Sequence, residues 1–193
     1  MFGRYYQAKE SYTFNMEQNI TIKGVVTMEN RSLTTVGSFI ASMLGVVSNN
    51  LKTQYAQKYG QLLWSETVNN IVTSAGKAQI ALLAGDAAAV PFTFLELGLS
   101  NTAPVIGQTA LVSAIVDSGL VRSAASVSRV TTTVTNDTLQ LSFTWTATGS
   151  RSVEEVGQFN AGSGGVMLGR ALTGTKSLAN GNIFTVTYRT TFI

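Results

Sequence analysis

The chain contains no cysteine and no histidine among its 193 residues, and only 12% of its residues are charged. Without cysteine there are no disulfides and no thiol nucleophiles, and without histidine there are no His-based triads and none of the usual zinc sites. An enzyme without these residues could still use a carboxylate mechanism or a Ser–Lys mechanism. We therefore expect a protein that is not an enzyme and has no cofactor, stabilised by core burial or oligomerisation.

Concentrated charge and long apolar runs are also missing. The net charge is +3, and the thirteen Lys and Arg residues are scattered along the chain, whereas a nucleic-acid groove usually shows a concentrated basic patch. The longest apolar stretch, near residues 39–47, is shorter than the ~20 residues that span a bilayer, and the N-terminus lacks the apolar segment of a signal peptide. We expect neither nucleic acid nor a membrane as a partner.

Alternation of apolar and polar residues is what the second half of the chain has in abundance, most clearly at residues 139–147. Side chains alternate across a strand, so this segment has one apolar face and one hydroxyl-rich face. The apolar set, which we expect in the core, is Leu139, Leu141, Phe143 and Trp145. We predict that the opposite face meets neighbouring molecules, and its suspected assembly contacts are Gln140, Thr144 and Thr146.

Further strands are predicted at residues 92–99, 120–134, 153–160, 166–172 and 183–193, with a bulge or bend near Arg129. Gly162–Gly165 is interpreted as a hairpin tip, and Asn180-Gly181 as the turn of another hairpin. About six strands at this spacing indicate a mainly β protein. We expect an immunoglobulin-like or jelly-roll β-sandwich with an N-terminal arm and one or two helices.

The first part of the chain is harder to assign. Residues 31–50 fit either a bent strand or a glycine-broken helix, while residues 51–64 have helix-like spacing. The best predicted helix covers residues 66–84, with Ser65 as N-cap and Gly85 as C-cap. We accordingly expect an N-terminal arm with a β/helical segment at residues 1–64, and a helix plus β-sandwich domain at residues 65–193.

Few residues could carry chemistry. Glu154 and Glu155 are adjacent, so on a strand they point to opposite faces, and we favour one solvated Glu and one paired with an Arg over a glycosidase pair. No acidic cluster has EF-hand spacing, so no metal site is predicted.

Tyrosines near the N-terminus and at positions 55 and 59 could stack on a carbohydrate or anchor an arm on a neighbouring subunit. We favour the interface. The arm residues that we suspect of assembly contacts are Tyr5, Tyr6, Tyr12 and Phe14.

Five segments together resemble a family of small virion proteins of tailed bacteriophages. They are FLELGLSNTAP (94–104), SAASVSRVTTTV (123–134), VEEVGQFNA (153–161), GGVMLGR (164–170) and NGNIFTVTY (180–188). The resemblance covers roughly residues 66–193 and is most specific in the hairpin "FNA…GG". The chain departs from the family pattern at Gln158 and Gly169, where an aliphatic residue and an alanine are common.

The resemblance implies a structural role in the virion and carries over no catalytic residues. We expect a capsid decoration or cement protein that stabilises the head lattice, with a tail, neck or fibre-adaptor protein as one alternative. A carbohydrate-binding adhesin module is the other alternative. The expected partners are the major capsid protein or other virion proteins and copies of the chain itself, with a trimer as the assumed homo-oligomer, and the expected location is the virion.

Overall fold

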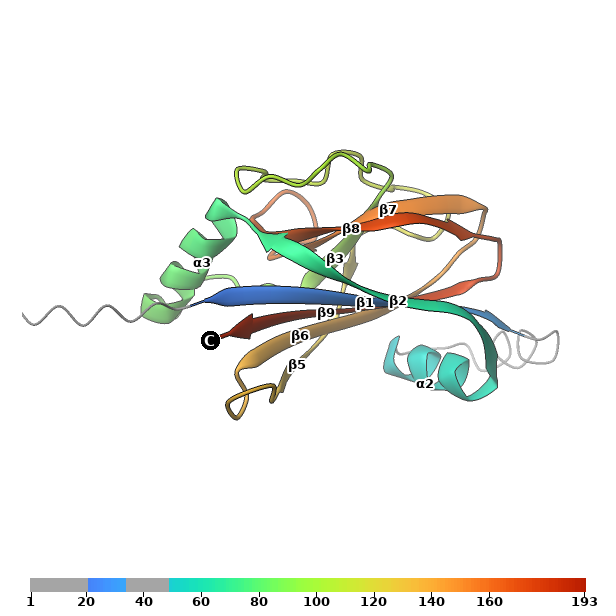
Figure 1. The fold of residues 1–193 in the computed structure, drawn as a ribbon, viewed down its shortest axis with the longest axis horizontal. Helices are drawn as coiled ribbons and strands as arrows, with labels where there is room; N and C mark the ends of the chain where they lie inside the picture. Colours follow the sequence, from blue (N-terminus) through green and yellow to red (C-terminus); the bar gives the residue numbers. More distant parts are fainter. Residues whose placement is uncertain (1–20, 34–48) are drawn as a thin grey trace, which may run out of the picture.

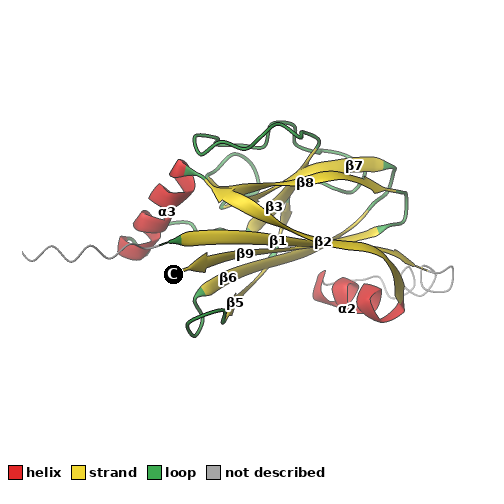
Figure 2. Ribbon diagram, in the orientation of Figure 1, coloured by secondary structure: helices red, strands yellow, loops and turns green. Residues whose placement is uncertain are grey.

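The computed structural model of the chain describes residues 21–33 and 49–193, which form two helices and a nine-stranded antiparallel sheet (Figures 1 and 2). The elements are β1 (Ile22–Leu33), α2 (Asn49–Tyr59), β2 (Gly60–Val72), α3 (Ser74–Gly85), β3 (Phe94–Gly98), β4 (Ser123–Ala124), β5 (Ser126–Val130), β6 (Thr138–Thr146), β7 (Arg151–Phe159), β8 (Met167–Leu178) and β9 (Ile183–Phe192). This mainly β architecture confirms the predicted fold class.

The strands follow the order β4-β3-β7-β8-β2-β1-β9-β6-β5, and β2 belongs to both layers of the sandwich. Its first part pairs with β1 from Gly60 to Asn69, whereas its end, from Asn70 to Val72, pairs with β8. We call the layer of β5, β6, β9, β1 and β2 sheet A, and the layer of β2, β8, β7, β3 and β4 sheet B. A single strand therefore joins the two sheets along one side.

The other side of the sandwich is closed by β4 and β5, which stand at opposite ends of the strand order but are consecutive in the chain. β4 pairs with β3 in sheet B and β5 pairs with β6 in sheet A, so the chain changes sheets at Ala125. The N–H of Ala125 donates to the carbonyl of Thr93 at 2.8 Å. The sandwich is consequently almost closed.

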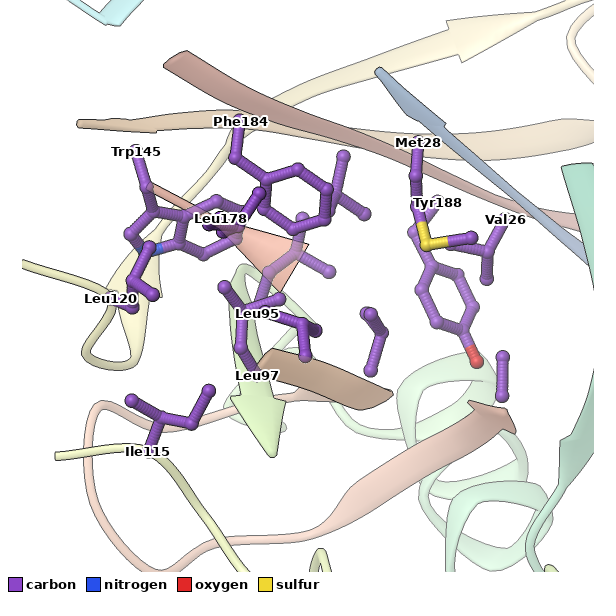
Figure 3. Packing of buried hydrophobic residues seen from close by; sticks show 14 of the residues in the cluster. Val26, Met28, Leu95, Leu97, Ile115, Leu120, Trp145, Leu178, Phe184 and Tyr188 are labelled. Atoms are coloured by element: carbon purple, nitrogen blue, oxygen red, sulfur yellow. The ribbon is translucent and has the colours of Figure 1, made fainter. Parts of the chain in front are cut away.

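The core lies between the two sheets (Figure 3). Sheet A contributes aromatic side chains, among which Trp145 and Phe184 have ring centroids 6.2 Å apart, and the indole N–H of Trp145 donates to the carbonyl of Val121 at 2.8 Å. Sheet B contributes aliphatic side chains such as Leu95 and Leu97. Of the four core residues expected on β6, Leu141 and Trp145 are buried, while Leu139 and Phe143 are partly buried.

The helix predicted at residues 66–84 is wrong in its first half, because β2 continues to Val72. The β-branched residues at the end of β2 favour a strand, and its long ladder with β1 outweighs the helix-like spacing. The helix α3 starts after Thr73, not Ser65, and the Thr73 hydroxyl accepts the N–H of Gly76 at 2.9 Å. Asp86, and not the predicted Gly85, caps the C-terminus of α3. The domain boundary that we placed between residues 64 and 65 lies inside β2.

Three other assignments are corrected. The helix expected at residues 51–64 ends at Tyr59, because β2 begins at Gly60. Of the segment 31–50, which the sequence did not assign, residues 34–48 lie outside the described residues. Within the segment 120–134 only β4 and β5 are strands, and the ladder of β5 is regular through Arg129. The turn at Asn180-Gly181 forms, with φ +83° at Gly181. It connects β8 in sheet B to β9 in sheet A and is not the turn of a hairpin, because these two strands do not pair.

The chain after β5 wraps around the carboxylate of Asp137. The backbone N–H groups of Thr132, Thr133 and Val134 all donate to it, at 2.7–2.9 Å. Desolvation acts to raise the pKa of this carboxyl, but the backbone hydrogen bonds, with that of the Thr132 hydroxyl, outweigh it and hold the pKa well below its usual value. The turn between β5 and β6 therefore depends on an ionised Asp137.

Replacing Asp137 by Asn should lower the melting temperature at neutral pH, because the amide cannot accept as many N–H groups as the carboxylate. A depressed folded-state pKa contributes stability above the unfolded pKa of about 4, and this contribution is lost as the pH falls further. The difference in melting temperature between wild type and D137N should therefore become smaller below about pH 4. Thermal melts from pH 7 to pH 3 test this, with Asp86→Asn as the control, because its amide oxygen can still accept the N–H that Ala88 donates to Asp86. An unchanged gap at low pH would contradict it.

Gly76 allows α3 to pack closely on β8. A Cβ at this position would lie 2.5 Å from the carbonyl oxygen and 2.6 Å from the Cα of Leu168. Gly76→Ala should therefore destabilise the fold by about 1–3 kcal/mol, although alanine favours a helix interior by about 1 kcal/mol. Urea unfolding followed by circular dichroism measures this.

The matched control is Gly85→Ala, at the end of the same helix, where a Cβ would meet nothing within 4 Å. This variant should be neutral or slightly more stable than wild type. Equal effects of the two substitutions would show that contact with Leu168 does not decide the outcome.

Candidate functional site

The outer face of sheet A carries a row of hydroxyl side chains. The register places Ser142 opposite both Ser126 and Thr187, and Thr27 opposite both Thr187 and Thr67. The row therefore crosses β5, β6, β9, β1 and β2 in turn, and we call its five residues the hydroxyl row. Within it, the hydroxyls of Thr27 and Thr67 are 3.0 Å apart and those of Ser142 and Thr187 are 3.4 Å apart.

A second polar row lies beside the hydroxyl row and contains Gln140. Its side-chain oxygen accepts the Nε–H of Arg189 at 2.7 Å, and its amide nitrogen donates to the Ser128 hydroxyl at 3.3 Å. On the far side of Arg189 the register continues through Val25 to Asn69. The predicted polar face of β6 thus continues onto the neighbouring strands of sheet A, where Val25 is the apolar member of the second row.

The helix α2 covers one end of this face, and it buries Thr144 completely. The Thr144 hydroxyl lies 2.5 Å from that of Thr53 on α2 and 2.9 Å from that of Thr185 on β9. Thr144 therefore makes contacts within the chain. Gln140 and Thr146 are partly exposed, and as contacts with another molecule they stay a prediction.

The aromatic contacts suspected in the arm, Tyr5, Tyr6, Tyr12 and Phe14, lie outside the described residues. Tyr55 and Tyr59 form a pair on α2, where their ring centroids are 4.8 Å apart. The Lys58 ammonium lies 5.0 Å from the Tyr59 ring centroid, and Tyr59 is half-exposed.

A buried ion pair faces outward from sheet B, on the side away from the core. Glu155 on β7 accepts the Nε–H of Arg170 on β8 at 2.5 Å, and the two side chains are 0% and 1% exposed. The pairing of one of the two adjacent glutamates with an Arg is confirmed, and Glu154, which is partly exposed, accepts a hydrogen bond from the Thr175 hydroxyl.

Both members of this ion pair bind the loop at residues 99–122, which we call the long loop. The Glu155 carboxylate accepts the backbone N–H groups of Val112 and Ser113, at 3.2 and 2.9 Å. Arg170 donates to the side chain of Gln108 at 3.2 Å and to the carbonyl of Ser100 at 3.4 Å. The buried charges thus tie the loop to the sheet at several separate points.

A second ion pair holds the end of the long loop. Arg122 donates to Glu96 at 2.7 Å and to the carbonyls of Ala161 and Gly164 at 3.1 and 2.8 Å. Its guanidinium carbon lies 3.8 Å from the ring centroid of Phe159, a cation–π contact. The loop is thereby joined to the tip of the β7–β8 hairpin, where Asn160 accepts the N–H of Val166 at 2.7 Å.

The long loop turns some apolar side chains inward and others outward. Leu111 packs with Phe159 and Met167 on the outer side of sheet B, while Ile115 and Leu120 join the main core. The residues turned outward, with their exposed fractions, are Val105 (58%), Ile106 (62%), Val112 (51%) and Val116 (80%). We did not predict this exposed set, because residues 99–119 show no clear period in the sequence.

The described residues hold neither a cluster of possible metal ligands nor a helix that could span a membrane. Within residues 21–33 and 49–193, no three acidic side chains gather closely enough to hold a metal ion, and no helix there is long and apolar enough to cross a membrane. An open pocket of about 420 Å³ is lined by Leu99, Ser150, Arg151, Ser152, Ser177 and Leu178. Its Arg151 pairs with Asp117, and this hydrogen bond lowers the pKa of Asp117.

The chain matches none of the models of known protein families, and no curated protein matches it either. The case for a function therefore depends on the geometry above and on the resemblance of residues 66–193.

Replacing Glu155 by Gln should destabilise the fold by about 3–5 kcal/mol, because it leaves the buried Arg170 without its counter-charge. It should also loosen the long loop, which loses a charged acceptor for two N–H groups. Chemical unfolding measures the first effect, and the rate of limited proteolysis within residues 99–122 measures the second.

Glu154→Gln is the matched control, because it makes the same change one residue away on the partly exposed face of β7. It should alter stability by less than about 0.5 kcal/mol. If E155Q resembled E154Q in both measurements, the ion pair would not be what fastens the loop.

Proposed function

We propose that this protein is a structural component of a tailed-bacteriophage virion, where it decorates the capsid and stabilises the head lattice. The observation that carries the proposal is the polar outer face of sheet A, with its hydroxyl row and the adjoining row through Gln140 and Arg189. The resemblance of residues 66–193 to small virion proteins supports it independently.

The chemistry of this face suits a repeated protein lattice. Serine and threonine hydroxyls both donate and accept hydrogen bonds, and the strand spacing of about 4.8 Å sets them at regular intervals. One such bond contributes only about 1 kcal/mol, so binding requires many of them at once. A lattice that binds many copies side by side provides that multiplicity.

The residues that carry the resemblance also serve a structural role in this chain. The polar groups of Glu155, Asn160 and Arg170 are engaged in contacts within the fold. The hairpin therefore supports the fold. This is the role that we expect of it in a protein that functions by binding through its surface.

The test is co-sedimentation of the purified chain with capsids of its phage that lack it. Wild type should bind and raise the temperature at which the capsids rupture. Ser142→Lys, within the hydroxyl row, should weaken binding roughly tenfold or more, because it places an unpaired charge in the interface. Ser163→Lys, an exposed position at the tip of the β7–β8 hairpin, adds the same charge elsewhere and should bind like wild type.

The other outcomes separate the alternatives. Binding to purified tails, necks or fibres and not to heads would replace decoration by an adaptor role in the virion. Binding to cell-surface glycan without binding to any virion part would favour an adhesin, with the Tyr55–Tyr59 pair as the first site to examine. Equal capsid binding by S142K and wild type would show that the hydroxyl row is not the contact surface.

A further inference from the structure

The turn Asn180-Gly181, which connects sheet B to sheet A, contains the chemically least durable residue pair of the chain. The backbone nitrogen that follows an asparagine can attack the carbonyl carbon of its side chain, and a glycine there has no side chain to hinder the attack. Among the asparagines of the sequence, Asn180 alone precedes a glycine. Both residues are exposed, so water reaches them.

The reaction open to this pair is deamidation. The Gly181 nitrogen gives up its proton and bonds to Cγ of Asn180, the Cγ–Nδ2 bond breaks, and the side-chain nitrogen leaves as ammonia with that proton. The resulting succinimide ring then takes up one water molecule at one of its two carbonyls. Hydrolysis at one carbonyl gives aspartate, and hydrolysis at the other gives isoaspartate, whose backbone runs through the β-carbon. The whole reaction consumes one water, releases one ammonia and needs no other reactant.

The folded turn restrains the nitrogen that would attack. The Gly181 N–H donates to the carbonyl of Ala147 at 2.7 Å, and Ala147 is buried. Removing this proton would leave a nitrogen anion against the carbonyl oxygen, and turning the nitrogen towards the Asn180 side chain would break the hydrogen bond. The turn itself is closed by the N–H of Asn182, which donates to the carbonyl of Ala179 at 3.0 Å. The reaction therefore has to wait until the turn opens.

The buried side chain of Asn182 ties the turn to the rest of the fold. Its Oδ1 accepts the backbone N–H of Ala179 at 3.0 Å and an Nδ2–H of Asn30 on β1 at 3.1 Å. Ala179 and Asn182 are thus joined by two hydrogen bonds across the turn. An isoaspartate at position 180 adds one atom to the backbone between these two residues, so the bonds that join them would be strained or lost.

We propose that Asn180 is a deamidation site which the folded turn protects, and that its modification is a lasting mark of a molecule in which the turn has opened. Once isoaspartate has formed, the turn does not return to its original geometry, so opened molecules accumulate in the modified form. The inference does not depend on capsid binding, because it follows from the connection between β8 and β9.

The rate of deamidation at Asn180 tests the proposal, measured by mass spectrometry of the peptide that contains it during incubation of the full chain at mildly alkaline pH. The chain in buffer should react roughly tenfold or more slowly than the same chain in urea, because only opened molecules react. In urea, Asn180 should react faster than Asn101, an exposed asparagine followed by threonine. Equal rates at Asn180 in buffer and in urea would overturn the proposal, as would a rate in urea no faster than that of Asn101.

Asn182→Ala is the variant that loosens the turn, because it removes the acceptor for Ala179 and Asn30 and leaves the Asn180-Gly181 pair unchanged. It should raise the rate at Asn180 in buffer roughly fivefold or more, as the loss of one hydrogen bond does to the opened population. Its rate in urea should equal that of wild type. Asn101→Ala is the control and should leave both rates unchanged. A folded N182A chain, verified by circular dichroism, that reacts in buffer at the wild-type rate would contradict the proposed protection.

The lasting effect has its own measurement. Refolded molecules that carry isoaspartate, separated by chromatography, should melt at a lower temperature than wild type. Asn180→Asp is the matched control, because it has the side chain of the other product on a backbone of normal length, and it should melt like wild type. Isoaspartate molecules that melt like wild type would show that the modification leaves no lasting mark on the turn.

Discussion

The Glu155–Arg170 ion pair is the interaction on which the outer half of this molecule depends. Removing two charges from water is costly, and the attraction between them compensates only when their other hydrogen-bonding groups are also satisfied. Here the long loop satisfies them, through two backbone N–H groups to Glu155 and two oxygen acceptors for Arg170. The dependence is mutual, because the loop excludes water from the ion pair and the ion pair holds the loop. A segment with little regular secondary structure thus becomes an ordered third layer.

The closure of the sandwich gives the other side of the molecule its shape. β2 joins the sheets along one side, and the change of sheets at Ala125 joins them along the other. Sheet A is therefore held at both margins, and within the described residues the helix α2 covers the part of its outer face that contains Thr144. The fixed margins matter here because hydroxyls from five separate strands align only while the strands keep their register.

The sequence predicted the elements whose hydrophobic pattern is local. It failed for segments whose secondary structure is determined by pairing with a strand that is distant in the sequence. Alternation identified β6, β7 and β9, because one face of each strand is apolar over several residues. Reasoning from spacing assigned residues 66–72 to a helix, because nothing local reveals that Val68 will pair with β1, or Ile71 and Val72 with β8. The Asn180-Gly181 turn was found, but not that it leads to the other sheet. At the site, an arginine partner for one glutamate was expected, whereas its identity depended on the register of β7 with β8.

The two outward surfaces differ in chemistry, and the difference bears on their roles. The face of sheet A offers hydrogen-bonding groups that water also satisfies, so any single contact there is weak and binding must come from repetition. The long loop offers apolar groups that gain by leaving water, so one contact there can be stable alone.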